Sequence, residues 1–212
     1  MPSRFDGQIA EVDAALRAKD EAREKIISFS REIIRRSGSA VLSMHKGDGA
    51  GAAASLEAAG AALAAAVGAC RGQPEFMYTG PLPQAFQEYA EARILEAMMK
   101  DARIPSPSEL GVPVEPYATG LADAAGEMRR VALDSLRKDD FGGAERAMAI
   151  MEEAYVGLKS LDYPRAVVPN LKRKVDVIRR LVEETRGDVT LAHQGRLIRE
   201  SLANARPEGD RR

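Results

Sequence analysis

The chain has 212 residues, 45% of them hydrophobic and 30% charged, which is the composition of an ordinary globular protein. Its 31 basic and 32 acidic residues nearly cancel, so a general electrostatic attraction to nucleic acid or membranes is excluded and any such attraction must come from local clusters. A single cysteine, Cys70, excludes an intramolecular disulfide and a Cys-rich metal site. The N-terminus is charged and no uninterrupted apolar run is long enough to span a membrane, so we expect a cytoplasmic protein without signal peptide or membrane span.

Apolar residues recur at helical spacing along most of the chain. Residues 6–45 contain no proline and predict one very long helix, or two nearly collinear ones, which the glycines of "KGDGAG" (46–51) end. Further helices are predicted over about 52–70, 84–103, 117–138, 141–161 and 170–205, and the helix over 141–161 is expected to be interrupted. Only "GVPVEPY" has strand character, and its prolines argue against strand pairing.

These helices predict an all-α fold, a single-domain bundle of about six to seven antiparallel helices over residues 1–205, followed by a disordered tail over 206–212. A helix over residues 6–45 would be about 60 Å long, well beyond the width of a compact domain of this size. Because its apolar residues continue along its length, we expect a homo-oligomer in which neighbouring subunits cover the overhang.

Two glutamates in "QEYAEARILEAMM" (87–99) stand out in the third predicted helix. Glu88 and Glu91 fall on its apolar side, one turn apart, whereas Arg93, Glu96 and Lys100 group on the other side and predict the solvated face. Burying an unpaired carboxylate costs several kcal/mol or raises its pKa until it takes up a proton. A bound cation between the two glutamates is one way to offset that cost.

The fourth predicted helix carries a second acidic pair, Asp123 and Glu127, also on one face. If the two helices pack antiparallel, the four carboxylates can converge. Oxygen ligands suit a hard cation such as Mg²⁺ or Mn²⁺. Such a site can activate water and stabilise charge on a phosphoryl group, which points to phosphodiester or pyrophosphate hydrolysis.

The pattern leaves a plainer interpretation open. Arg130 and Asp134 lie on the same stripe as the second acidic pair, so that helix could simply display a solvated, salt-bridged face. A di-iron centre would need Glu-x-x-His, and neither His45 nor His193 lies three residues after a glutamate. No P-loop pattern occurs, and Ser-His-Asp or Cys-His catalysis has little support.

Basic residues cluster at two places. Arg31, Arg35 and Arg36 lie on the first helix, and a denser group on the last helix consists of Lys172, Arg173, Lys174, Arg179 and Arg180. Nonspecific phosphate contacts need local positive charge of this kind, although a solvated helix face explains any one of these residues as well. No aromatic residue is interleaved with the clusters, so base stacking is not indicated and backbone contacts would have to bind a nucleic acid.

Four stretches resemble the translin family, specifically the branch typified by translin-associated factor X. They are "SREIIRRSGSAVLSMHKGD", "QEYAEA", "GLADAAGEMRR" and "NLKRKVDVIRRLVEETRGD", and together they span most of the chain. The resemblance implies an all-α fold of about seven helices that assembles into hollow, barrel-like octamers binding RNA or single-stranded DNA. The factor X branch is a metal-dependent endoribonuclease.

Carried over by motif, the resemblance places the metal ligands at Glu88, Glu91 and Asp123, with Glu127 as a fourth catalytic acid. It implies that water bound to Mg²⁺ or Mn²⁺ hydrolyses an RNA phosphodiester. The RNA path would be lined by the basic groups of the first and last helices, namely Arg31, Arg35, Lys172, Arg173 and Lys174. Because one chain carries both features, a self-sufficient homo-oligomer is the preferred interpretation.

Two alternatives from other classes remain. One is a non-catalytic assembly that binds RNA or single-stranded DNA. The other is an all-α nucleotide pyrophosphohydrolase, which also uses Glu-x-x-Glu followed by a second acidic pair on a neighbouring helix. That second pair is usually Glu-x-x-Asp, however, and "DAAGE" (123–127) has the wrong order and spacing.

Overall fold

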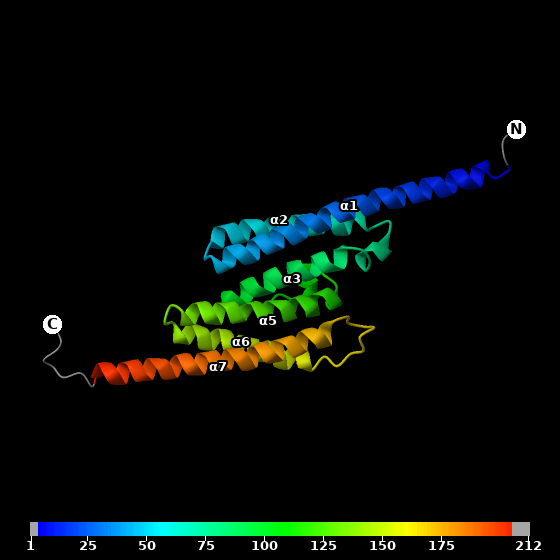
Figure 1. Ribbon diagram of the computed structural model, residues 1–212. Coiled ribbons are helices and arrows are strands. Elements are labelled where there is room, and N and C mark those ends of the chain that lie inside the picture. Colours follow the sequence, from blue (N-terminus) through cyan, green and yellow to red (C-terminus); the bar gives the residue numbers. More distant parts are fainter. Residues whose placement is uncertain (1–3, 205–212) are drawn as a thin grey trace. The chain divides into compact units, whose positions relative to one another are not determined.

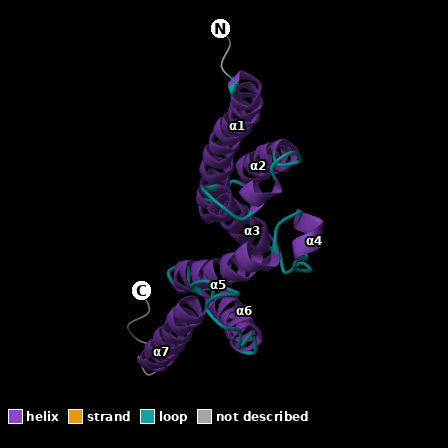
Figure 2. Cartoon of the chain, turned by 90° about the vertical axis from the view of Figure 1, so that its right-hand side faces the viewer, coloured by secondary structure: helices purple, strands orange, loops and turns teal. Residues whose placement is uncertain are grey.

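The computed structural model describes residues 4–204, and within them the chain forms helices and no strand (Figures 1 and 2). The predicted all-α class is therefore confirmed. In chain order the elements are α1 (Asp6–His45), α2 (Gly49–Ala69), the 3-10 helix η1 (Pro74–Met77), α3 (Leu82–Met99), α4 (Pro107–Leu110), α5 (Val114–Leu136), α6 (Phe141–Lys159) and α7 (Leu171–Asn204).

The observed ends of the six predicted helices lie within four residues of the predicted ones, and two other features differ from the prediction. The predicted interruption of the helix over 141–161 is wrong, because Gly142 and Gly143 fall in the first turn of α6, where Asp140 caps the helix by accepting a hydrogen bond from the amide of Gly143 at 2.8 Å. The short α4 lies inside a stretch predicted as a connection. A reciprocal capping box between Ser106 and Glu109 holds it. The predicted tail over 206–212 lies outside the described residues.

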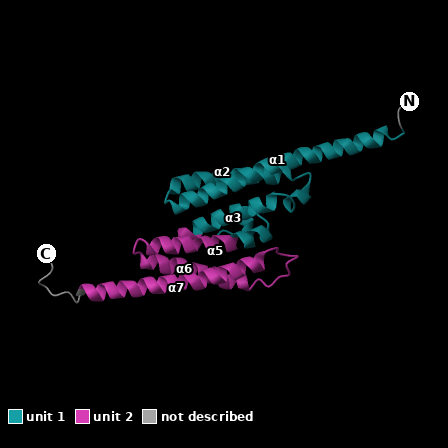
Figure 3. Ribbon diagram, viewed as in Figure 1, with its two compact units in different colours: residues 1–97, 104–120 teal, residues 98–103, 121–212 magenta. Residues whose placement is uncertain are grey.

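Contacts between Cα atoms divide the chain into two compact units (Figure 3). The first comprises residues 1–97 and 104–120, and the second comprises residues 98–103 and 121–212. The division falls within α5, after Gly120. The single domain predicted over residues 1–205 stays a prediction.

The first unit contains the hairpin of α1 and α2, which a three-residue turn joins (Figure 1). The buried residues of each helix recur alternately every three and four positions, so each forms a single stripe facing the other helix. The stripe on α1 consists of Ile26, Ser30, Ile33, Ser37, Ala40 and Met44. The stripe on α2 consists of Ala52, Leu56, Ala59, Leu63 and Ala66. Small residues in both stripes let the two backbones approach closely.

The first half of α1 runs past the end of α2 (Figure 1). Every residue from Asp6 to Glu21 is exposed, including the apolar Ile9, Val12 and Leu16, whose exposed fractions are 64%, 54% and 61%. The predicted overhang of a 40-residue helix is thus confirmed. An exposed apolar stripe of this kind marks a surface that another protein surface can cover.

Among the described helices, α2 is long and apolar enough by composition to cross a membrane. Core helices of water-soluble proteins also meet this criterion of length and composition, so one such helix is weak evidence for a membrane span. The apolar character of α2 comes mainly from its alanines, which favour helix formation and let the helix pack closely on α1.

The second unit contains the larger part of α5 with α6 and α7. Arg129 on α5 is tied to α7 by a hydrogen bond from Nη1 to the hydroxyl of Thr185 at 2.8 Å and by an ion pair with Asp188 at 3.0 Å. Thr185 is fully buried, and its own hydroxyl donates to the carbonyl of Leu181 at 2.6 Å. These polar contacts fix the register of α5 against α7 within a largely apolar interface.

Candidate functional site

The first acidic pair lies on α3. Glu88 and Glu91 are half-buried, as expected for the apolar side of the helix. Of the three residues predicted to form the solvated face, Lys100 is exposed, but the prediction is wrong for Arg93 and Glu96, which are half-buried as well. Along α3 only Gln84 and Met99 are exposed, so this helix is covered on nearly all sides.

A glycine brings the backbone of α5 against α3 within the first unit. A Cβ at Gly120 would lie 2.7 Å from the carbonyl oxygen of Gln87, closer than real Cβ atoms approach other atoms, and 3.0 Å from the amide nitrogen of Glu91, which is also a tight contact. Only glycine fits this position. The first residue of the "GLADAAGEMRR" motif therefore packs directly on the segment that carries Glu88 and Glu91.

The second acidic pair lies in the second unit, on α5, and one of its members has a cationic partner. Lys174 on α7 donates through Nζ to both carboxylate oxygens of Asp123, at 2.5 and 2.6 Å. The Lys174 and Asp123 side chains are only 17% and 27% exposed. Glu127 is half-buried on the same face of the helix. At the far end of the stripe Arg130 and Asp134 form a loose ion pair at 3.9 Å.

A metal needs several ligands brought together. In the described part of the chain, no three or more His, Cys, Asp or Glu side chains are grouped so that they could hold a metal ion. The carboxylates of Glu88, Glu91 and Asp123 have the donor chemistry that Mg²⁺ or Mn²⁺ prefers. At Asp123, however, both oxygens already accept hydrogen bonds from the Lys174 ammonium, so a metal there would have to share or displace that cation.

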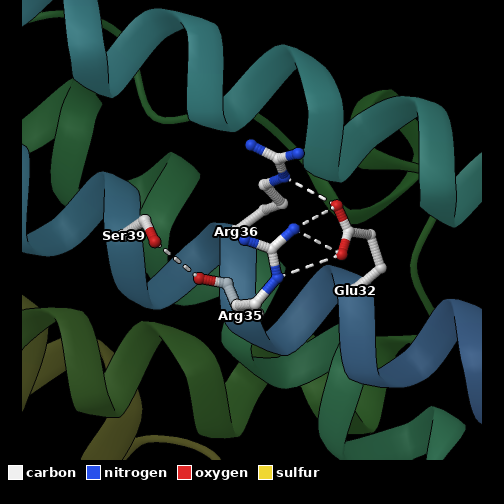
Figure 4. Close-up of polar contacts among 4 residues, drawn as sticks. All are labelled: Glu32, Arg35, Arg36 and Ser39. Carbon is white, nitrogen blue, oxygen red and sulfur yellow. Dashed lines mark hydrogen bonds and ion pairs between the residues drawn. The ribbon is translucent and has the colours of Figure 1, made fainter.

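The basic cluster of α1 is partly neutralised within its own helix. Glu32 accepts hydrogen bonds from the guanidinium groups of both Arg35 and Arg36, with distances of 2.6–3.1 Å (Figure 4). The side-chain hydrogen bonds from Arg35 and then Arg36 hold the pKa of the Glu32 carboxyl below its ordinary value. Arg31 lies exposed on the same helix and, within residues 4–204, has no such carboxylate partner.

The basic run at the start of α7 also contains both ion-paired and unpaired residues. Lys174 is half-buried and paired with Asp123, whereas Lys172 and Arg173 are exposed and form no ion pair in the described part of the chain. Of the five residues predicted to bind RNA, the structure therefore leaves Arg31, Lys172 and Arg173 with their charges available. The pairing of Lys174 was missed because its partner lies 51 residues away in the sequence.

Comparison with solved structures finds close similarity to AfC3PO. The chain matches AfC3PO in a structure of its complex with duplex RNA, with a TM-score of 0.83 and 31% identity over 90% of this chain and 98% of that one. A separate crystal structure of AfC3PO matches equally well, over 99% of its chain. The apo form of NeC3PO matches with a TM-score of 0.76 and 24% identity, a level that shows the shared fold alone.

Sequence comparison agrees with the structural one. The uncharacterized protein MJ0175 of Methanocaldococcus jannaschii is 35% identical over 185 residues, which cover 87% of this chain and 82% of that protein. Residues 21–185 match the Translin family. The match runs from the middle of α1 to the middle of α7 and includes both acidic pairs and both basic clusters. The resemblance seen in the sequence motifs is confirmed: this chain belongs to the translin family.

Proposed function

We propose that this protein is an RNA-binding homo-oligomer that acts as a metal-dependent endoribonuclease. The observation that carries the proposal is the similarity to AfC3PO, a protein solved in complex with duplex RNA, which extends over 90% of this chain at 31% identity. Membership of the translin family favours this function over the nucleotide pyrophosphohydrolase alternative.

RNA binding is assigned to the cations that have no carboxylate partner. Arg31, Lys172 and Arg173 can contact phosphates without first breaking an ion pair. Arg35 and Lys174 would have to leave Glu32 and Asp123, and we assign them lesser parts. Because phosphate contacts carry no information about base or sugar, single-stranded DNA is a second possible ligand of the same residues.

Assembly is assigned to the overhanging half of α1. Another copy of the chain would cover Ile9, Val12 and Leu16, and the family resemblance implies eight copies. Light scattering on the purified protein would give the mass of the assembly, and division by the chain mass of 22.9 kDa would give the number of copies. Replacing Ile9 and Leu16 by glutamate should reduce the measured mass, and an unchanged mass would move the interface elsewhere.

Catalysis is assigned to Glu88, Glu91 and Asp123 as ligands of Mg²⁺ or Mn²⁺. When bound, such a cation would supply an activated water and offset charge on the phosphate oxygens. Glu127 is assigned the role of orienting the attacking water and accepting its proton. The support for these roles is the motif that each residue occupies and the oxygen-only donor set.

The test is cleavage of an end-labelled short RNA in Mg²⁺, Mn²⁺ or EDTA, with RNA affinity measured in parallel by fluorescence anisotropy. The double substitution Glu88→Gln, Glu91→Gln removes two charges at nearly constant volume, so we expect cleavage to be lost and RNA affinity to be retained. Glu57→Gln on the exposed side of α2 is the matched control and should cleave like the wild type. Full activity in the double variant would refute the site.

A second candidate function is favoured by one contact in the structure. Because the Lys174 ammonium already neutralises Asp123, the acid can be a structural group in an assembly that binds RNA without cleaving it. Asp123→Asn separates the two possibilities. If Asp123 is a metal ligand, Asp123→Asn should lose cleavage and unfold at nearly the same urea concentration as the wild type. If Asp123 is a structural group, the variant should be less stable than the wild type, and neither the variant nor the wild type should cleave RNA.

A further inference from the structure

A cavity of about 570 Å³ lies in the second unit, where α6 ends and α7 begins. Its lining comes from the last turn of α6, the connection over residues 160–170 and the first turns of α7. Its volume is within the range of pockets that take small ligands. None of the four acidic candidates, Glu88, Glu91, Asp123 and Glu127, lines it.

Positive charge is concentrated in this cavity. Four basic side chains line it, those of Lys159, Arg165, Lys172 and Arg173. The acidic side chains in the lining are two, those of Asp162 and Asp176. The chain as a whole has a net charge of −1, so the excess here is local. In the described residues, Arg165, Lys172 and Arg173 form no ion pair. Unpaired cations around a hollow favour an anionic ligand, and a phosphate group can bind without displacing a carboxylate.

Two tyrosines line the same cavity. Tyr155 is half-buried, and the ammonium of Lys159 lies 5.7 Å from the centre of its ring. Tyr163, in the connection to α7, is 61% exposed. No aromatic residue is interleaved with the basic run in the sequence, yet the fold brings these two tyrosines to the same cavity as Lys172 and Arg173. An exposed aromatic ring beside several cations has the chemistry to stack a base and bind its phosphate.

We propose that this cavity binds one unpaired nucleotide of an RNA, with its base stacked on Tyr163 and its phosphate held by Lys172 and Arg173. The proposal rests on the proposed RNA binding and adds a preference to it. Paired bases inside a duplex are stacked on one another and cannot reach a tyrosine, so the cavity selects an overhang or a single-stranded end. Stacking on tyrosine tolerates any base, so the preference is for the unpaired state and independent of base identity.

The experiment compares two labelled RNAs by fluorescence anisotropy, a blunt duplex and the same duplex with a short unpaired overhang. In Tyr163→Ala we expect affinity for the overhang RNA to fall about fivefold or more and affinity for the blunt duplex to stay unchanged. Tyr163→Phe retains the ring and should bind as the wild type does. Tyr78→Ala replaces a tyrosine of similar exposure, 69%, outside the cavity and is the matched control.

The cations are tested by the salt dependence of overhang binding. The double substitution Lys172→Gln, Arg173→Gln should make the slope of log affinity against log salt shallower by about 0.7 for each phosphate that is no longer neutralised. Arg180→Gln, which removes an exposed charge on the same helix outside the cavity, should change it less. Equal losses of affinity for both RNAs in Tyr163→Ala, or no loss for either, would overturn the proposal.

Failure of RNA binding itself would give a different result. If the wild-type protein binds neither RNA, the proposed function fails. Calorimetric titration with a nucleoside monophosphate then tests whether the cavity binds a nucleotide at all. Binding of the monophosphate that is lost in Tyr163→Ala would show a site for free nucleotides and overturn the RNA assignment. Absence of that binding would overturn the cavity as a nucleotide site.

Discussion

Gly120→Ala is the substitution whose effect follows most directly from the structure. Gly120 lies in α5, where alanine would normally be the better residue because glycine weakens a helix by about 1 kcal/mol. Here the added Cβ would meet backbone, at 2.7 Å from the Gln87 carbonyl oxygen and 3.0 Å from the Glu91 amide nitrogen. Backbone within a helix cannot rotate aside as a side chain can.

The size of the effect can be worked from these distances. Ordinary contact begins at 3.4 Å, so α3 and α5 must separate by about 0.7 Å at this point. Overpacking of this kind costs about 1–3 kcal/mol, of which better helix propensity recovers up to about 1 kcal/mol. For a chain of this length, each kcal/mol corresponds to about 2–4 °C in melting temperature. With a net cost of about 1–2 kcal/mol, the middle of the range that these two terms leave, we expect the melting temperature to fall by about 2–8 °C.

Thermal unfolding followed by circular dichroism at one fixed protein concentration would measure this change. The matched control is Gly126→Ala in the same helix, whose Cβ would lie 3.6 Å from Cδ1 of Leu181, an ordinary contact. The control should be as stable as the wild type or more stable. If Gly120→Ala is equally stable, the close approach of α5 to the Glu88–Glu91 segment does not exist in solution.

Four further substitutions or measurements test particular contacts. Ser37→Ala should raise the free energy of unfolding in urea by about 1 kcal/mol, because the buried Ser37 hydroxyl has no hydrogen-bond partner among residues 4–204 and alanine favours helix. Thr185→Val should lower it by about 1 kcal/mol, because the hydroxyl that accepts from Arg129 and donates to Leu181 is lost at constant shape. Lys174→Met should lower it by about 1–2 kcal/mol, since Asp123 keeps its charge in a half-buried position, and an unchanged urea midpoint would show that the pair is not formed. Burial raises the pKa of the Cys70 thiol, so less thiolate is present at a given pH and the folded protein should react slowly with a disulfide reagent at pH 8, with rapid reaction in urea as the control.

Local signals in the sequence were enough to predict the six long helices. The absence of proline from residues 6–45 and the glycines after them predicted α1 with both ends correct. In α6 the predicted break does not occur: Asp140 caps the helix, Gly142 and Gly143 fall in its first turn, and it runs unbroken from Phe141 to Lys159. The capping box of α4 is also a local pattern, but four residues give no periodicity that could predict a helix.

Burial was harder to predict than helicity. The sequence of α3 suggested an apolar side carrying Glu88 and Glu91 and a solvated side carrying Arg93 and Glu96. In the structure all four residues are half-buried, because neighbouring segments cover α3 on nearly all sides. Periodicity identifies a face only when one side of a helix meets solvent. The half-burial of these two glutamates is therefore no longer unusual in itself, and their assignment as metal ligands depends on the family motif and on the proposed cleavage assay.

Charge runs show the same limit and affect how the RNA path should be tested. Lys172, Arg173 and Lys174 are consecutive, yet successive residues of a helix point about 100° apart, so the three cannot share one environment. Lys174 is held by Asp123, while Lys172 and Arg173 line a cavity without carboxylate partners. A triple substitution would therefore lose a half-buried ion pair together with two phosphate-binding groups, and reduced RNA binding could then reflect altered packing of α5 against α7. Substituting Lys172 and Arg173 together, and Lys174 alone, assigns the loss of affinity to the first variant and the loss of stability to the second.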